Sequence, residues 1–552
     1  MDVLLLHPPA TKPAEPPLGV AILLGHLRAQ GLEADAIDAN LAAYLHLLEP
    51  ARLSAAAGPA AKTRLKRAVR HAQGSLTLLR ASAAVESFAR YSTAARYLND
   101  ALSAHRGTTG AELTLGDYVQ EGLSEFSPDD LERLSRGEAK TLFFGYFRDV
   151  LVPQIEEQRP RLIALSITFR NQVLPAFELA GMLRRALPGT LLVGGGGMFG
   201  SWRQTLRKLS LRFGAFDRVV FGPGEAPLTA LARGTAAADY FLEDDVECGF
   251  APDFSFAALG DYLSPEKVLP VSATRGCYWR HCLFCPDGVA PSHSYRCAPP
   301  AQFPLLLGEL GRQHGVRHFH VTDNAIPMNV LHQLAKPAAA AGGFAWHGFV
   351  RFEKALLDEA FVSGLARSGC TLLQLGLESG SQRVLDRLKK GTQLGQVSRI
   401  LENLARAGIA AYVYIMLGTP GETLEDARLT LRFLEEHAHR IGFLNLAIMN
   451  LPRDTRLLDD KALHGISSSK LLEESEPLGL YQSFEPAEGF GRAEARRFLM
   501  VSLLGSAAIR GIAARTPPFF TSNHAFLFGE NSKRREEFGR PAPGLAGAPE
   551  SD

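Results

Sequence analysis

The stretch RGCYWRHCLFCP, residues 275–286, places three cysteines within nine residues. Four cysteines usually hold an iron–sulfur cube, one for each iron. Three close thiolates without an obvious fourth would leave one iron open, and an open metal position is where a substrate or cofactor can coordinate. The spacing therefore predicts an iron–sulfur cluster on Cys277, Cys282 and Cys285.

A structural zinc site is the alternative for this stretch, with His281 as the fourth ligand. His281 adjoins Cys282, which makes simultaneous ligation awkward, and structural zinc sites usually come as two separated ligand pairs. The remaining cysteines, Cys248, Cys297 and Cys370, are expected to be ordinary buried thiols.

The cysteine stretch follows the first of six strand-like runs that alternate with helical patterns, such as those at 382–390 and 396–407. This alternation predicts a partial (β/α)6 barrel over residues 267–460, with its site at the carboxyl ends of the strands. The expected strands are 268–274, 318–323, 344–350, 371–379, 410–418 and 443–451.

A second α/β unit is expected before the barrel, over residues 1–235. Five short runs alternate with helices and predict an open, flavodoxin- or Rossmann-like parallel sheet that binds a ligand beyond its strand ends. The stretch 41–148 is rich in Ala, Leu and Arg and indicates a helical insertion, although a separate helical domain explains it equally well. The expected strands are 2–7, 33–38, 161–168, 190–193 and 218–221.

Three further segments complete the expected organisation. Residues 236–266 contain several prolines and aromatics and are interpreted as a linker. Residues 461–532 are expected to form a mainly helical C-terminal region, of which about 489–530 lies over the barrel mouth. Residues 533–552 are charged and rich in Pro and Gly, which predicts a disordered tail.

The Arg-Gly-Cys turn and the aromatic-Cys pair resemble the signature of cobalamin-binding radical S-adenosylmethionine (radical SAM) enzymes. The usual spacing is Cys-x3-Cys-x2-Cys, whereas this chain has four residues in the first gap, an expansion found among cobalamin-binding members. The resemblance implies a 4Fe–4S cluster whose open iron chelates S-adenosylmethionine (SAM). An external one-electron reductant such as flavodoxin or ferredoxin would then drive cleavage to a deoxyadenosyl radical.

Other motifs of the expected barrel carry the same resemblance. The segments LESGS at 377–381 and GTPGET at 418–423 resemble the family's ribose-side segment and its Gly-x-Pro-Gly-Glu-Thr turn. The segment LPRDT at 451–455 departs from the family's Pro-Gly-Thr. The SAM contacts that the resemblance implies are Phe284, Thr322, Asp323, Arg351, Glu378, Ser379 and Gly421.

The first unit resembles the cobalamin-binding domain of the same enzymes. The similar segments are HPP at 7–9, PPLG at 16–19, LSIT at 165–168, GGGG at 194–197 and GPGE at 222–225. The Asp-x-His-x-x-Gly motif, whose His ligates cobalt in other cobalamin domains, is absent, and His7 is the one nearby imidazole. The implied cobalamin contacts are Pro9, Leu18, Gly19, Ser166, Thr168, Gly194, Gly195, Gly196, Gly222, Gly224 and Glu225.

These features predict a cytoplasmic enzyme that methylates an unactivated carbon, or phosphorus, of a natural-product or cofactor-type substrate, whether small molecule or peptide. One alternative keeps both cofactors and performs a cyclisation, rearrangement or oxidation. Another is a non-catalytic, zinc-stapled cobalamin-binding protein. The formal net charge is +1, so nucleic acid is not expected as a partner, and neither a signal peptide nor a membrane span is expected.

Overall fold

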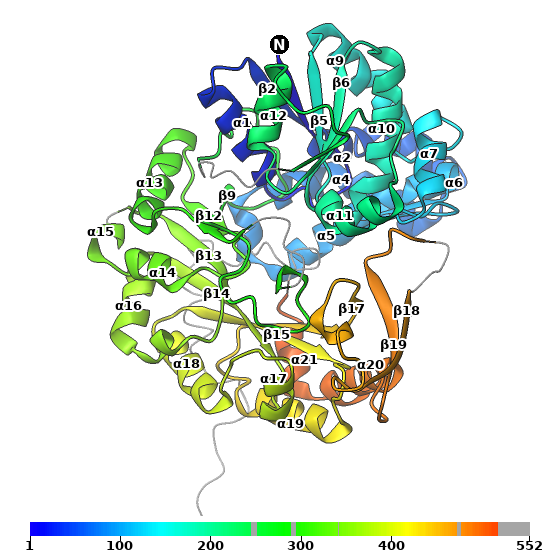
Figure 1. The fold of residues 1–552 in the computed structure, drawn as a ribbon. Coiled ribbons are helices and arrows are strands. Elements are labelled where there is room, and N and C mark those ends of the chain that lie inside the picture. Colours follow the sequence, from blue (N-terminus) through cyan, green and yellow to red (C-terminus); the bar gives the residue numbers. More distant parts are fainter. Residues whose placement is uncertain (244–250, 289–293, 341, 472–475, 517–552) are drawn as a thin grey trace, which may run out of the picture.

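Two six-stranded parallel sheets frame the molecule, as seen in a computed structural model that describes residues 1–243, 251–288, 294–340, 342–471 and 476–516. Figure 1 shows the first sheet with its helices (blue through cyan to green) packed over the second (green to yellow). A small C-terminal sheet (orange) lies beside the second. This arrangement confirms the α/β class expected from the sequence.

The first sheet, here called the N-terminal sheet, has the strand order β2-β1-β5-β6-β7-β8. Side chains of β1 alternate between two cores, because successive residues of a strand face opposite sides. Leu4 and Leu6 enter one core, whereas Val3 and Leu5 enter the other. The strands are β1 (Val3–His7), β2 (Ala34–Asp38), β5 (Leu162–Ser166), β6 (Leu191–Gly195), β7 (Arg218–Phe221) and β8 (Phe241–Glu243).

Helices cover both faces of the N-terminal sheet. The helices α1 (Leu18–Ala29) and α12 (Glu225–Ala232) supply apolar residues to the core that contains Val3. The helices α10 (Val173–Ala186) and α11 (Gly197–Leu209) contribute to the core that contains Leu4. Strand β8 was not predicted from the sequence; it lies within the expected linker and pairs with β7.

The inserted segment shares its core with the N-terminal sheet. Its Leu98 and Leu131 belong to the same buried cluster as Leu4 and Leu6, which supports an insertion rather than a separate domain. Its helices are α2 (Ala39–Leu47), α3 (Pro50–Ala57), α4 (Thr63–Leu79), α5 (Phe88–Leu102), α6 (Arg106–Thr109), α7 (Pro128–Arg136) and α8 (Phe144–Tyr146), with α9 (Val152–Gln158) leading back to the sheet. The sequence analysis did not anticipate the short hairpin of β3 (Ala111–Leu113) and β4 (Tyr118–Gln120).

The second sheet is the expected partial barrel, with all six strands parallel in the order β16-β15-β14-β13-β12-β9. Each expected run overlaps one of these strands, and β14 begins one residue earlier than expected. They are β9 (Val268–Val271), β12 (His318–Val321), β13 (Ala345–Val350), β14 (Cys370–Glu378), β15 (Ala410–Leu417) and β16 (Phe443–Ile448). The main helices between them are α13 (Phe303–His314), α14 (Met328–Leu334), α16 (Glu359–Arg367), α17 (Gln382–Arg387), α18 (Leu394–Arg406) and α19 (Leu424–Glu436).

The C-terminal region contains the expected helices α20 (Arg492–Phe498) and α21 (Ala507–Ala513). It also forms an antiparallel sheet of β17 (Leu451–Pro452), β19 (Tyr481–Pro486) and β18 (Ile466–Leu471), which the sequence analysis did not foresee. Leu478 from this region enters the core of the N-terminal sheet, and its carbonyl accepts a hydrogen bond from Trp202 Nε1 at 2.8 Å. The expected disordered tail lies outside the described residues.

None of the helices in the described ranges combines the length and the apolar character needed to cross a membrane.

Candidate functional site

The cysteine loop follows β9 and the short strand β10 (Thr274–Arg275) at the carboxyl end of the barrel. Gly276 has φ +76°, a left-handed conformation that glycine adopts at no steric cost. The Cys285 amide donates to the Cys282 carbonyl at 3.3 Å, which places these two cysteines on one turn. Burial raises the pKa of both thiols, that of Cys285 to about 11. Without a metal both would therefore be protonated at neutral pH.

Asp323 holds the strand that leads into this loop. Its carboxylate accepts hydrogen bonds from the Ala273 amide, at 3.0 Å, and from the Thr274 hydroxyl. The residue is 2% exposed, and burial raises its pKa to about 6 even though these hydrogen bonds oppose the shift. Asp323 thus braces the backbone three to four residues before Cys277.

Arg351, at the end of β13, lies against the loop. Its guanidinium carbon is 4.0 Å from the centroid of the Trp279 ring, and its Nη1 is 4.0 Å from Cys282 Sγ. Its Nε donates to Glu353 at 3.1 Å, and that carboxylate also accepts from Tyr278 Oη at 2.7 Å. A fixed positive charge beside Cys282 stabilises an anionic thiolate or cluster.

Lys390, which was not among the residues predicted from the sequence, also lies beside the loop. Its Nζ is 2.8 Å from Glu378 Oε1 and 5.7 Å from the centroid of the Phe284 ring. The Lys390 carbonyl also accepts from Arg351 Nη2 at 2.6 Å. The structure therefore brings Arg351, Glu378 and Phe284, three of the expected SAM contacts, around the cysteine loop.

The other expected SAM contacts have structural partners. The Thr322 hydroxyl donates to the Val271 carbonyl at 3.2 Å. Ser379 is 1% exposed, and its hydroxyl accepts from the Ser381 amide at 3.1 Å. Gly421 has φ +73°, and a Cβ there would come within 2.2 Å of Arg387 Nη2. Local packing thus accounts for Ser379 and Gly421, and their roles toward SAM stay predictions.

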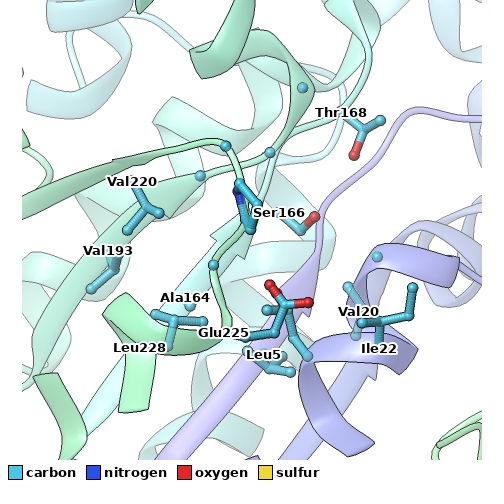
Figure 2. Close-up of a pocket in the computed structure, with 18 of the residues that line it drawn as sticks. Leu5, Val20, Ile22, Ala164, Ser166, Thr168, Val193, Val220, Glu225 and Leu228 are labelled. Carbon is cyan, nitrogen blue, oxygen red and sulfur yellow. The ribbon is translucent and has the colours of Figure 1, made fainter. Parts of the chain in front are cut away.

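A cavity of about 260 Å³, here called the strand-end pocket, opens at the carboxyl ends of the N-terminal sheet. Figure 2 shows Ser166, Thr168 and Glu225 among apolar side chains of its lining. Eight of the eleven expected cobalamin contacts lie here. They are Gly19, Ser166, Thr168, Gly195, Gly196, Gly222, Gly224 and Glu225.

Three expected cobalamin contacts and His7 lie outside that lining. Leu18 packs against the barrel core, and Gly194 faces Phe199, where a Cβ would approach the ring to 2.7 Å. Pro9 does not line the pocket, and neither does His7, although the sequence placed His7 toward it. His7 is buried, with Nε2 3.2 Å from the Thr11 hydroxyl and Nδ1 3.4 Å from Gln172 Nε2.

A second cavity, here called the interface cleft, has a volume of about 400 Å³. It is lined by the start of α11, by Pro286 and Asp287 after the cysteine loop, and by residues 452–454 and 479–481 of the C-terminal sheet. Gly197 lines both the cleft and the strand-end pocket. The LPRDT segment, which departs from the family pattern, thus contributes Arg453 and Asp454 to this cleft, and burial raises the pKa of Asp454.

Among the residues that the structure describes, no three or more His, Cys, Asp or Glu side chains are grouped as ligands of a metal ion. His281, the fourth ligand of the zinc alternative, packs edge-on against Trp279 with ring centroids 5.1 Å apart. Each cysteine of a cluster binds a different iron, so its ligands do not converge on one ion.

Comparisons with known proteins relate part of the chain to a known family. Residues 271–434 match the family described as the radical SAM superfamily, so the chain contains a radical SAM domain. The match begins at the last residue of β9 and covers the cysteine loop and the strands from β12 to β15.

Two solved structures share the overall fold. The radical SAM methyltransferase TsrM from Kitasatospora setae, with tryptophan substrate and a SAM analog bound, aligns over 92% of this chain and 89% of its own, with 15% identity and a TM-score of 0.55. The cobalamin-dependent SAM radical enzyme OxsB, with aqua-cobalamin bound, aligns over 91% and 67%, with 13% identity and a TM-score of 0.56. At such identities the likeness establishes the fold.

Curated relatives match shorter segments. Bacteriochlorophyllide d C-12(1)-methyltransferase of Chlorobaculum tepidum is 28% identical over 207 residues, 35% of this chain and 42% of the relative. Cytidylyl-2-hydroxyethylphosphonate methyltransferase of Streptomyces wedmorensis is 24% identical over 192 residues, 32% and 34% of the two chains. The matches thus span less than half of these relatives.

Proposed function

We propose that the protein is a cobalamin-dependent radical SAM methyltransferase that acts on an unactivated carbon, or phosphorus, of a small-molecule or peptide substrate. One observation carries the proposal: the strand-end pocket and the cysteine loop adjoin each other, because Arg275 lines the pocket and precedes Gly276 and Cys277. A methyl donor and a radical source that share one substrate need this proximity.

The residues of both sites fit the proposed groups. The cysteine loop offers three thiols beside the cations of Arg351 and Lys390, a suitable setting for an anionic cluster with one open iron. Several glycines line the strand-end pocket, and a Cβ on Gly195 would meet no atom closer than 3.7 Å, so the space beside it is open to a ligand. Its apolar walls suit the tail of a large planar cofactor, with hydroxyls at Ser166 and Thr168.

When bound, the cluster with SAM would supply a deoxyadenosyl radical and cobalamin would supply the methyl group. The protein's part is placement and exclusion of solvent. Asp323 fixes the entry to the cysteine loop, and Arg351 and Lys390 hold positive charge beside it. The interface cleft adjoins both sites and is the substrate access that we propose, since Pro286 follows Cys285 and Gly197 borders the strand-end pocket.

Anaerobic reconstitution tests the proposal. The full chain should bind iron, sulfide and hydroxocobalamin. With an external one-electron reductant and SAM labelled at its methyl group, it should yield both 5′-deoxyadenosine and S-adenosylhomocysteine when the substrate is present. Deoxyadenosine without S-adenosylhomocysteine would favour a cyclisation, rearrangement or oxidation. Zinc in place of iron would support the non-catalytic alternative.

A further inference from the structure

A buried ion pair joins the wall of the strand-end pocket to the cysteine loop. Glu225 begins α12 and is 2% exposed, and its Oε1 pairs with Arg275 Nη2. Arg275 belongs to β10, and only Gly276 separates it from Cys277. The contact therefore bridges two segments 50 residues apart in the chain, one in each parallel-sheet unit.

The pair also supplies the charge in the pocket lining. Among the described residues that line it, Glu225 and Arg275 are the charged ones, and the remainder are apolar, small or hydroxyl-bearing. Removing one partner of a buried pair leaves an uncompensated charge, which is strongly unfavourable. A ligand that fills the pocket therefore lies against both side chains of the pair, and its binding depends on how they are placed.

We propose that the Glu225–Arg275 pair couples occupancy of the strand-end pocket to the position of the cysteine loop. The inference rests on the proposed function for the identity of the ligand, which is cobalamin. A ligand in the pocket excludes water from the pair and so strengthens its attraction. The strengthened pair holds Arg275 in place, and with it the segment that carries Cys277.

The coupling is reciprocal, because a link between two binding equilibria acts in both directions. A cluster on the loop fixes the backbone at Arg275. The ion pair in the pocket wall is then already formed when cobalamin binds. Cobalamin should then bind more tightly to the cluster-loaded protein than to the cluster-free protein. Arg275 is therefore a positioning residue that acts through Glu225 and through the segment that carries Cys277.

The test compares hydroxocobalamin dissociation constants of the full chain with and without the reconstituted cluster, measured anaerobically by equilibrium dialysis. The wild-type protein should bind about five- to a hundredfold more tightly with the cluster present, the usual range for coupled sites. The coupling ratio is the dissociation constant without the cluster divided by that with the cluster. Arg275→Gln and Glu225→Gln should each reduce this ratio to about one, and Arg275→Lys should retain part of it.

A matched control is Arg28→Gln, which breaks another ion pair of the N-terminal unit, that of Arg28 Nη1 with Asp253 at 2.7 Å, and should leave the ratio unchanged. A purely structural role would weaken both binding reactions equally and keep the ratio. Equal affinities in the two wild-type forms would overturn the coupling while leaving the proposed function intact. Failure of both forms to bind hydroxocobalamin would overturn both.

Discussion

The ammonium of Lys390 lies 2.8 Å from the carboxylate of Glu378, and the two residues meet beside the cysteine loop. Glu378 has φ +71°, a left-handed conformation that side chains rarely adopt. A Cβ on Gly376 would come within 2.8 Å of both Glu378 Oε1 and Lys390 Nζ. Backbone strain of this kind persists where the surroundings over-determine it, and it clusters at functional sites.

We expect Glu378→Gln and Lys390→Met to weaken SAM binding without loss of the cluster. Each change removes a charge-assisted interaction of roughly 1.5–3 kcal/mol, which corresponds to about ten- to a hundredfold in affinity. Equilibrium binding of SAM to the reconstituted protein measures the effect. Glu359→Gln, at an exposed ion pair with Arg406, is the control. Unchanged affinity in both site variants would show that the SAM site lies elsewhere.

Asp323→Ala should impair cluster assembly as well as SAM binding. The sequence expectation concerned SAM alone, but the carboxylate holds Ala273 and Thr274 at the entry to the cysteine loop. Iron and sulfide content after reconstitution measures this effect, with Glu378→Gln as the comparison that keeps its cluster. A full complement of iron in Asp323→Ala would show that the loop does not need this brace.

Replacing Cys277, Cys282 or Cys285 by Ala should abolish the iron–sulfur absorbance, because a cube held by three thiolates cannot spare one. Cys297→Ser and Cys370→Ser should keep the iron–sulfur absorbance. Cys297 lies in β11 (Arg296–Cys297), which pairs with β10, and Cys370 is buried at the start of β14. Visible absorption spectra after anaerobic reconstitution measure whether each variant holds the cluster. Loss of the cluster in either serine variant would reveal a fourth protein ligand.

Gly195→Val should block hydroxocobalamin binding and leave the fold intact. Gly195 ends β6 in the strand-end pocket, and a Cβ there meets nothing closer than 3.7 Å. Valine also suits a strand. Its neighbour Gly194 gives the matched contrast, because a Cβ there would press on Phe199, so Gly194→Val should lower the unfolding temperature. Normal cobalamin affinity in Gly195→Val would place the cofactor outside this pocket.

The cobalt of bound cobalamin should have no protein imidazole on its lower face. The described lining of the strand-end pocket contains no histidine, and both nitrogens of His7 lie within hydrogen-bond reach of Thr11 and Gln172. Electron paramagnetic resonance of the cobalt(II) form should give the same spectrum for wild type and His7→Ala. Nitrogen superhyperfine splitting that disappears in His7→Ala would identify His7 as the ligand.

Thermal stability should fall between about pH 4.5 and pH 7 through Glu178. Burial raises the pKa of this carboxyl from 4.5 to about 7, although hydrogen bonds from Thr141 oppose the shift. In this window the unfolded chain loses a proton that the folded protein keeps, so the folded state loses up to about 3 kcal/mol as pH rises. Unfolding temperatures across this range should decline less for Glu178→Gln, and parallel curves would contradict the assignment.

Much of this architecture could be predicted from sequence because each parallel strand is a short apolar run that ends in glycine or a polar motif. The hairpin of residues 111–120 and the C-terminal sheet were not predicted, since their strands are short or contain few buried residues. Local motifs also singled out Cys282 and Glu378, whose roles stay predictions. They could not locate Lys390 or Arg275, because the roles of these residues depend on partners 12 and 50 positions away.

The hydrogen bond from Trp202 to Leu478 spans 276 residues of sequence, and Leu478 packs in the core of the N-terminal sheet. During synthesis this core lacks Leu478 until the whole barrel has left the ribosome. Domains usually fold as units, the N-terminal one first. Here the N-terminal unit depends on a late segment, so a nascent chain exposes apolar surface for most of its translation. Expression of the two halves as separate polypeptides would leave that surface uncovered.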